Sequence, residues 1–352
     1  MVGDNQMKRP LFLLLPFVVL LLAAGCAKKE AAVDSAKLAF FTPLPGDTPV
    51  EATGPAAERI ALGRMLYYET RLSKNQQISC NTCHDLAKYG VDGEPTSEGH
   101  KAQRGDRNAP TVYNAAPQFA QFWDGRAPDV EAQAKGPVLN PIEMAMPSDK
   151  HVVAVLQSIP EYVAAFKRAF PDEKNPVTYD NMGKAIGAFE RRLLTPARWD
   201  KFLQGDQAAL AAEEKAGLIA FTGAGCQTCH AGSLLGGNLY QKIGALKPYP
   251  DASDPGRYKV TNNEGDRFLF KVPTLRNIEK TGPYFHNGKV VTLEQAVAQM
   301  ADFQLGKQLS DAELKSVITF LKALTGDLPA DYIKKPALPA STPKTPKPQE
   351  AD

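Results

Sequence analysis

Two short motifs constrain this chain more than any other feature. Residues 80–84 read Cys-Asn-Thr-Cys-His and residues 226–230 read Cys-Gln-Thr-Cys-His. The chain has only five cysteines and five histidines, so a histidine directly after each cysteine pair is informative. Two thiols on one helical turn can add to the vinyl groups of one porphyrin, and the next histidine then lies beneath the iron. The pattern predicts two covalent c-type haems, held by Cys80, Cys83 and His84 and by Cys226, Cys229 and His230.

Other uses of paired cysteines fit less well. A structural zinc site needs both pairs brought together, usually from nearby parts of the chain, whereas these pairs lie far apart in the sequence. A thioredoxin-like redox pair does not predict the adjoining histidine. Five cysteines are also too few for a disulfide scaffold.

Composition bounds the fold and the partners. The chain has 352 residues, of which 43% are hydrophobic, and this is enough for a globular protein of roughly two domains. Forty-one Lys and Arg residues against 39 Asp and Glu leave a net charge of +2, with no basic excess to neutralise phosphates. We therefore expect no nucleic-acid partner.

The N-terminus has the pattern of an export signal. Lys8 and Arg9 precede an apolar run over residues 11–24, which leads through Ala-Ala-Gly into Cys26. This predicts a lipoprotein-type signal peptide over residues 1–26, with lipidation of Cys26 and an outer-membrane anchor on the periplasmic side. A transmembrane helix is the weaker alternative because the run is short, and a soluble periplasmic protein results if Cys26 is lost with the signal.

The remainder reads as helical, without strand-like alternation. Capping boxes at Thr292-x-x-Gln295 and Ser310-x-x-Glu313 begin the last two helices, and Gly326 is expected to end the final one. We predict a mainly α fold with two cytochrome-c-like helical domains. The expected boundaries are a tether over residues 27–46, domains over residues 47–195 and 196–335, and a disordered tail over residues 336–352.

Further motifs extend the comparison beyond haem attachment. The chain carries Phe-Trp-Asp-Gly-Arg at 122–126, Asn-Pro-Ile-Glu-Met at 140–144, Phe-Glu-Arg-Arg-Leu-Leu-Thr-Pro at 189–196 and Phe-His-Asn-Gly at 285–288. In this order and spacing they resemble the bacterial dihaem cytochrome c peroxidases, from about residue 50 to residue 330. The resemblance implies a low-potential peroxidatic haem in the first domain and a high-potential electron-transfer haem in the second.

The sixth iron ligands decide the chemistry. Met300 stands in the last third of the chain at helical spacing with Leu293 and Val297, where a methionine otherwise fills core. The resemblance implies that Met300 is the distal ligand of the second haem. It likewise implies that His100, in a Gly- and charge-rich loop where a histidine is otherwise simply solvated, caps the first iron at rest and leaves when the second haem is reduced.

Three side chains are implied in the reaction itself. Glu143, which could otherwise be an exposed helix-start residue, is implied as the acid/base that moves a proton in peroxide cleavage. Its apolar context would raise its pKa. Gln133 is implied as the neighbour that orients peroxide. Trp123, otherwise a core aromatic, is implied to lie between the haems and to help electrons cross.

A calcium ion is also implied by the resemblance. Its ligands would be the side chain of Asn108 and the backbone carbonyls of Thr281 and Pro283, in segments that otherwise read as ordinary turns.

The expected function is reduction of hydrogen peroxide to water, with electrons from a small cytochrome c or copper protein. Two alternatives stay open: a dihaem electron carrier without catalysis, and a dihaem enzyme that oxidises a partner protein, as in maturation of the methylamine dehydrogenase cofactor. The latter enzymes carry Tyr at the distal position of the second haem, so Met300 argues against them. The resemblance further suggests a homodimer.

Overall fold

The computed structural model describes residues 1–4, 33–44 and 53–349. Cys26, most of the predicted signal peptide and residues 27–32 and 45–46 of the predicted tether lie outside the described residues. From Ala31 onward the chain forms one compact unit. Among the described residues no helix is long and apolar enough to cross a bilayer.

The fold is mainly helical, as the sequence predicts. The segment up to residue 195 contains α1 (Ser35–Leu38), α2 (Gly54–Tyr67), α3 (Cys80–Cys83), α4 (Val130–Leu139), α5 (Asp149–Gln157), α6 (Pro160–Ala169) and α7 (Tyr179–Glu190). The later helices are α8 (Arg198–Leu203), α9 (Ala212–Ala224), α10 (Tyr258–Thr261), α11 (Leu293–Leu305) and α12 (Asp311–Lys322). A small antiparallel pair, β1 (Tyr240–Lys242) and β2 (Leu269–Lys271), was not predicted because three-residue strands are too short to show alternation.

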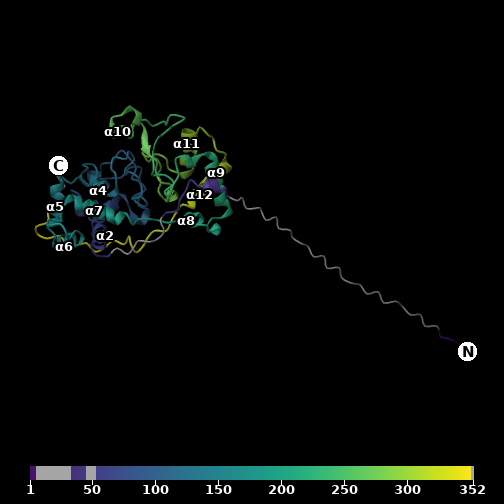
Figure 1. Cartoon of the computed structure of the whole chain (residues 1–352), viewed down its shortest axis with the longest axis horizontal. Helices are drawn as coiled ribbons and strands as arrows, with labels where there is room; N and C mark the ends of the chain where they lie inside the picture. The colour runs from purple at the N-terminus through teal and green to yellow at the C-terminus, as the bar shows by residue number, and fades with distance from the viewer. Residues whose placement is uncertain (5–32, 45–52, 350–352) are drawn as a thin grey trace. The chain divides into compact units, whose positions relative to one another are not determined.

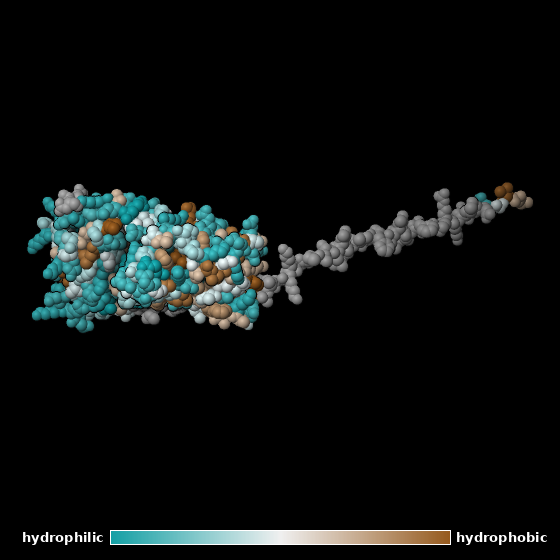
Figure 2. All heavy atoms as spheres, turned by 90° about the horizontal axis from the view of Figure 1, so that it is seen from above, coloured by the Kyte–Doolittle hydropathy of each residue, from teal (hydrophilic) through white to brown (hydrophobic). Residues whose placement is uncertain are grey.

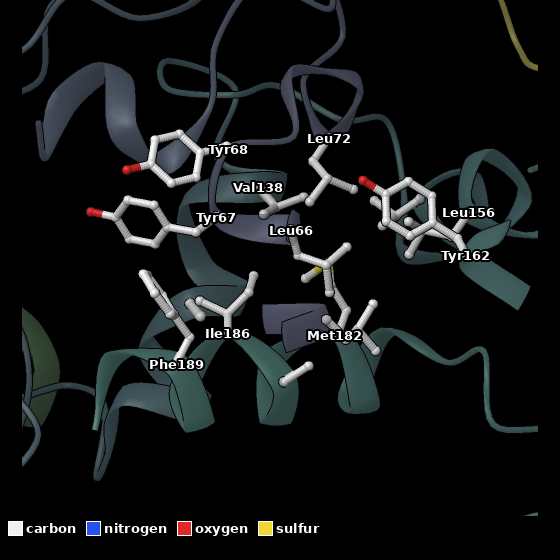
Figure 3. Packing of buried hydrophobic residues seen from close by; sticks show 14 of the residues in the cluster. Leu66, Tyr67, Tyr68, Leu72, Val138, Leu156, Tyr162, Met182, Ile186 and Phe189 are labelled. Atoms are coloured by element: carbon white, nitrogen blue, oxygen red, sulfur yellow. The ribbon is translucent and has the colours of Figure 1, made fainter. Parts of the chain in front are cut away.

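Helices α2, α4 and α7 form the first hydrophobic core (Figure 1). Figure 3 shows Leu66 of α2 beside Met182 and Ile186 of α7, all fully buried. The two helices approach closely at Gly63, where a Cβ atom would lie 1.8 Å from the carbonyl oxygen of Ala185. Only glycine permits this contact, which brings α2, the helix before the first haem motif, against α7.

A second core lies around Trp199, between α8, α9 and α12 (Figure 1). Its fully buried indole ring contacts Phe41, Phe202 and Phe320, with ring centroids 5.2 to 5.8 Å apart. The buried residues of the first core come from residues 62–193, and those of the second core come from Phe41 and residues 197–324. The chain therefore passes from one core to the other within a few residues of position 195.

Local signals at helix ends had mixed outcomes. Both capping boxes are present, with Thr292 paired to Gln295 and Ser310 to Glu313. The predicted stop at Gly326 is wrong, because α12 ends at Lys322 with Ala323 as its cap. Gly326 instead pairs with Ala197, in a contact where a Cβ atom would lie 2.2 Å from the Thr195 carbonyl oxygen.

Two terminal segments pack more tightly than the sequence suggests. In the segment expected to be a tether, Phe41 and Leu44 are buried, and the Leu44 N–H donates to Asp200 Oδ1 at 2.7 Å. In the segment expected to be disordered, residues 336–349 lie along the first core without forming a helix. We call residues 336–349 the C-terminal strap. Arg71 donates to the Pro339 carbonyl at 2.8 Å and Gln76 to the Pro346 carbonyl at 2.8 Å. Backbone carbonyls accept such hydrogen bonds whatever the side chains are, so these contacts leave no hydrophobic periodicity in the sequence. For this reason the sequence did not predict that either segment would pack.

The surface is mixed in character. On the face seen in Figure 2 hydrophilic residues predominate, and hydrophobic residues form small separate patches. Isolated exposed apolar residues of this kind are normal for a globular protein and define no interface.

Candidate haem and peroxide centres

The second centre is a cavity of about 230 Å³ lined mainly by apolar side chains. Cys226, Cys229 and His230 line it from the haem motif, and Met300 lines it from α11. His230 Nδ1 lies 3.0 Å from the Leu235 carbonyl oxygen, which orients the imidazole and leaves Nε2 to bind a metal. Burial lowers the pKa of His230 to about 4, so the ring is in the neutral form that coordinates iron. A thiol pair, an imidazole and a thioether thus face one apolar space.

The first centre begins at α3, a single turn that carries Cys80 and Cys83. Ser79 caps the turn through a capping box with Thr82, and the His84 N–H donates to the Cys80 carbonyl at 2.9 Å. Nδ1 of His84 is buried and has no hydrogen-bond partner among the described residues. An orphaned buried nitrogen on the residue that should lie beneath an iron fits the expected haem site.

The thiols of Cys80, Cys83 and Cys226 are not activated nucleophiles. Burial raises the pKa of Cys83 to about 11 and that of Cys226 to about 11, and it raises the pKa of Cys80 further still. Reactive cysteines have lowered pKa values, so this environment argues against a thiol-dependent peroxidase.

His100, the expected cap of the first iron, is buried. Only 5% of the residue is exposed, and neither ring nitrogen has a partner among the described residues. Its backbone N–H donates to the carbonyls of Ile142 and Glu143 at 2.9 and 2.8 Å. Gly99 makes this approach possible, because a Cβ atom there would lie 2.1 Å from the Ile142 carbonyl oxygen. The solvated-loop alternative for His100 is therefore wrong.

Glu143 is the carboxylate beside this loop. Asn140 Nδ2 donates to Glu143 Oε1 at 2.7 Å, which fixes one side of the carboxylate. Burial raises the pKa of Glu143, against the opposing influence of Arg126 and of the Asn140 hydrogen bond. Gln133 is half-buried on α4, in the helix that precedes the Asn140 turn.

Trp123 contacts both halves of the chain. Its Nε1 donates to the Asn108 carbonyl at 2.9 Å, and its own carbonyl accepts from the Lys271 N–H at 2.8 Å. The indole lines the second cavity and meets the His286 ring edge-on, with centroids 6.4 Å apart. His286, which the sequence places only in a turn, is 2% exposed and stacks on Phe270 at 4.2 Å.

The expected calcium ligands lie along the same cavity. Asn108, Thr281 and Pro283 all line it. The Asn108 side chain donates through Nδ2 to the Glu94 carbonyl at 3.0 Å, and its backbone N–H donates to the His286 carbonyl at 2.8 Å. No group of three or more His, Cys, Asp or Glu side chains that could hold a metal occurs in the described part of the chain. Any ion here would therefore depend on amide and backbone oxygens, which are ligands that Ca²⁺ accepts.

Sequence reasoning missed an ion network beside these residues. Arg107 donates to Asp124 at 2.6 Å and to Asp254 at 2.6 Å, and so joins the two halves of the chain. Arg107 adjoins Asn108 and Asp124 adjoins Trp123, but Asp254 lies far along the chain in a loop without any motif. Nothing in its local pattern could have identified it.

Comparison with known proteins agrees with this geometry. Residues 57–208 match the family described as di-haem cytochrome c peroxidase. The chain is 45% identical to the cytochrome c551 peroxidase of Pseudomonas aeruginosa, over 96% of this chain and 99% of that one. It is 48% identical to the cytochrome c551 peroxidase of Nitrosomonas europaea, over 86% of this chain and 90% of that one.

A solved structure shares the fold as well. A MauG-like protein associated with microbial copper homeostasis superimposes with a TM-score of 0.71 at 26% identity, covering 84% of this chain and 96% of that one. The fold and the two centres thus define a dihaem c-type oxidoreductase with one haem for each half of the chain. The chain belongs to the di-haem cytochrome c peroxidase family.

Proposed function

We propose that this protein reduces hydrogen peroxide to two molecules of water, taking two electrons from a small redox protein and two protons from solvent. The observation that carries the proposal is the juxtaposition of His100 and Glu143. The imidazole of His100 is buried, and both of its ring nitrogens lack a partner among the described residues. The His100 backbone N–H donates to the carbonyl of Glu143, whose carboxyl group has a raised pKa. This combines a removable iron ligand with a proton carrier at one place.

The haems supply electron storage and an iron that accepts peroxide oxygen; the protein supplies proton transfer, ligand exchange and a path for electrons. Glu143 takes the proton from the peroxide oxygen nearer the iron and returns it to the leaving oxygen. The hydrogen bond from Asn140 keeps the carboxylate oriented for both steps. Gln133 holds the peroxide by a polar contact.

Access to the first iron depends on His100. The His100 backbone N–H is shared between the carbonyls of Ile142 and Glu143. Among the described residues no hydrogen bond holds the imidazole itself. Release of His100 from the iron would open the peroxide site. Met300, which lines the second cavity, would bind the second iron together with His230. Thioether ligation would raise the potential of that haem and favour electron entry there.

Electrons pass between the centres by way of Trp123. The indole Nε1 donates to the Asn108 carbonyl in the first half, and the Trp123 backbone carbonyl accepts from the Lys271 N–H in the second, which supports this route. A calcium ion held by Asn108 with the Thr281 and Pro283 carbonyls would stabilise the same junction.

Location and partners complete the proposal. We assign the protein to the periplasmic face of the outer membrane, with lipidated Cys26 as anchor, because residues 1–26 have the lipoprotein pattern. The donor is a small cytochrome c or copper protein, and the enzyme functions as a homodimer. Mass spectrometry of the mature N-terminus tests the anchor, and sedimentation tests the dimer.

The function is tested with the purified dihaem protein by optical and EPR spectroscopy. The oxidised protein is half-reduced in the presence of calcium, and peroxide is added last. Loss of a low-spin His/His signal, appearance of high-spin iron and peroxide consumption are expected. Two haems that remain low-spin and do not react with peroxide would leave an electron carrier. Turnover only with a partner protein as the oxidised substrate would favour the protein-oxidising alternative.

A further inference from the structure

Lys271 is a buried cation that faces the second cavity. Only 7% of the residue is exposed, and it lines the cavity together with Gln118. Lys271 Nζ donates to Gln118 Oε1, and this neutral oxygen is its sole hydrogen-bond acceptor in the part of the chain that the structure describes. An ammonium group has three donors, so this environment leaves the group under-satisfied.

Two other buried cations among the described residues have carboxylate partners. Arg71 meets Glu69 at 2.5 Å, and Arg276, which is fully buried, meets Asp200 at 2.7 Å. A buried charge without a counter-ion is costly, whereas a buried charge facing an anion is tolerated. Lys271 has no carboxylate partner among the described residues, and burial lowers the pKa of its ammonium group to about 8.

A second polar atom faces the same cavity. Nε2 of His286 is buried and unpartnered among the described residues, and the residue is 2% exposed. Its ring is fixed by stacking on Phe270 and by the edge-on contact with Trp123. In a cavity lined mainly by apolar side chains, the Lys271 ammonium thus has one acceptor for three donors, and His286 Nε2 has no partner. The chemistry that satisfies both is a carboxylate.

The cavity is the one that Cys226, Cys229 and His230 line, and a haem attached there carries propionate carboxylates. We propose that Lys271, oriented by Gln118, and His286 form a carboxylate-binding subsite for the propionate groups of the second haem. This inference rests on the assignment of that haem in the proposed function. It makes Lys271 and His286 positioning residues for electron transfer.

The location of Lys271 gives the subsite a consequence. The Lys271 N–H donates to the Trp123 carbonyl at 2.8 Å, so the residue that would hold the propionate also holds the backbone of the interhaem tryptophan. The propionate edge of the haem is then fixed beside Trp123. In addition, a buried positive charge near the porphyrin favours the reduced iron, which carries one positive charge fewer. Lys271 should therefore raise the reduction potential of the second haem.

The test compares Lys271→Met, Lys271→Arg and Lys242→Met in the full dihaem protein. Lys242 is the matched control because it also lines the cavity but is exposed at the end of β1, opposite Leu269, where water screens its charge. The readout is the reduced-to-oxidised ratio of the second haem at a solution potential equal to the wild-type midpoint. Lys271→Met is expected to lower this ratio about tenfold, which is about 59 mV for one electron. Lys271→Arg and Lys242→Met should stay within about twofold of wild type. An equal ratio in Lys271→Met and Lys242→Met would overturn the inference.

Resonance Raman spectra of the half-reduced protein give an independent readout. The propionate bending band of the reduced haem should shift in Lys271→Met and in His286→Gln, and should return in Lys271→Arg. If Lys271→Met does not fold, His286→Gln still tests the subsite, and an unshifted band there would count against it. A wild-type midpoint that moves with acetate concentration, beside a Lys271→Met midpoint that does not, would assign the subsite to a free carboxylate instead.

Failure of this inference differs from failure of the proposed function. A protein that shows the Lys271 effect but does not consume peroxide contradicts only the function. A protein that consumes peroxide with unchanged potential and Raman band in Lys271→Met and His286→Gln contradicts only the subsite.

Discussion

Glu143 occupies an environment that raises the pKa of its carboxyl group above that of an exposed glutamate. Burial raises the pKa of its carboxyl group, while the Asn140 hydrogen bond and the charge of Arg126 limit the rise. A carboxyl group with a raised pKa takes up a proton more readily than an ordinary exposed glutamate does. This suits an acid/base, which must both take and return a proton. The pKa of Glu143 is thus set by its own burial and by two side chains, Arg126 and Asn140.

Replacing Glu143 by Gln should lower peroxide turnover by about 10²- to 10⁴-fold, the usual contribution of a positioned acid/base. Glutamine keeps the shape and can still contact Asn140, so both haem spectra and electron uptake should remain normal. Steady-state turnover with a reduced donor, beside optical spectra, measures this. The matched control is Glu98→Gln on the same side of the His100 turn, where the side chain is exposed. Turnover in Glu143→Gln equal to that control would exclude Glu143 as the proton carrier.

Sequence predicted the residues of the two haem motifs because their chemistry is contiguous in the chain. Cys80, Cys83 and His84 follow one another on a single turn, so spacing alone identified them. His100 and Glu143 meet only through tertiary hydrogen bonds, and from the residues alone each read as a surface side chain. Lys271 had no signal at all, since a single lysine at the end of a three-residue strand looks like any exposed edge residue.

At the scale of elements, the C-terminal strap replaces packing that the short helices of the first half do not provide. Arg71 donates to the Pro339 carbonyl and to Ser341, and the Gln349 N–H donates to the Lys74 carbonyl at 2.9 Å. The Lys74 N–H in turn donates to the Met144 carbonyl at 2.8 Å, next to Glu143. The strap therefore supports the turn that carries the proposed acid/base.

Deleting residues 336–352 should destabilise the folded protein by about 2–4 kcal/mol, since several part-buried hydrogen bonds are lost at about 1 kcal/mol each. Chemical denaturation followed by circular dichroism measures the change. Lys347→Ala in the full-length chain is the control, because Lys347 is exposed. Equal stability of the deletion and the control would mean that the strap only lies against the core.

The loop between β1 and α10 is joined to the first half by Asp254. Burial on its own raises the pKa of this carboxyl, but hydrogen bonds and charge from Arg107 outweigh it and lower the pKa to about 2. A carboxyl whose pKa is lower in the folded than in the unfolded protein stabilises the fold above the unfolded value. That stabilisation is lost as the pH falls toward 2.

Asp254→Asn should therefore cost about 2 kcal/mol of stability at neutral pH, and the difference from wild type should narrow between pH 4 and pH 2. Denaturant titrations at several pH values measure this. Asp172→Asn, at an exposed position, should show no such pH dependence relative to wild type. A deficit in Asp254→Asn that stays constant down to pH 2 would mean that the loss is steric and not electrostatic.

At the scale of the whole molecule, the two centres are coupled through few contacts. Trp123 joins Asn108 to β2, and Arg107 joins Asp124 to Asp254, within one stretch of the junction. A change of charge at the second centre can reach the first only through such bonded groups or through the electric field. In the proposed function such a change has to reach His100, whose backbone N–H donates to the Ile142 and Glu143 carbonyls.

Replacing His100 by Gly should open the first iron to peroxide whatever the oxidation state of the second haem. The first iron should then be high-spin even when both haems are oxidised, and peroxide should react without the half-reduction that the proposed function requires of the wild type. Glycine suits the tight turn beside Gly99, and it removes only the imidazole. EPR spectra of the oxidised protein and stopped-flow mixing with peroxide measure both effects. His151→Ala on α5 is the control and should keep the wild-type requirement for half-reduction. If the first iron of His100→Gly stays low-spin when oxidised, another side chain closes the site, and the coupling between centres must act on that residue.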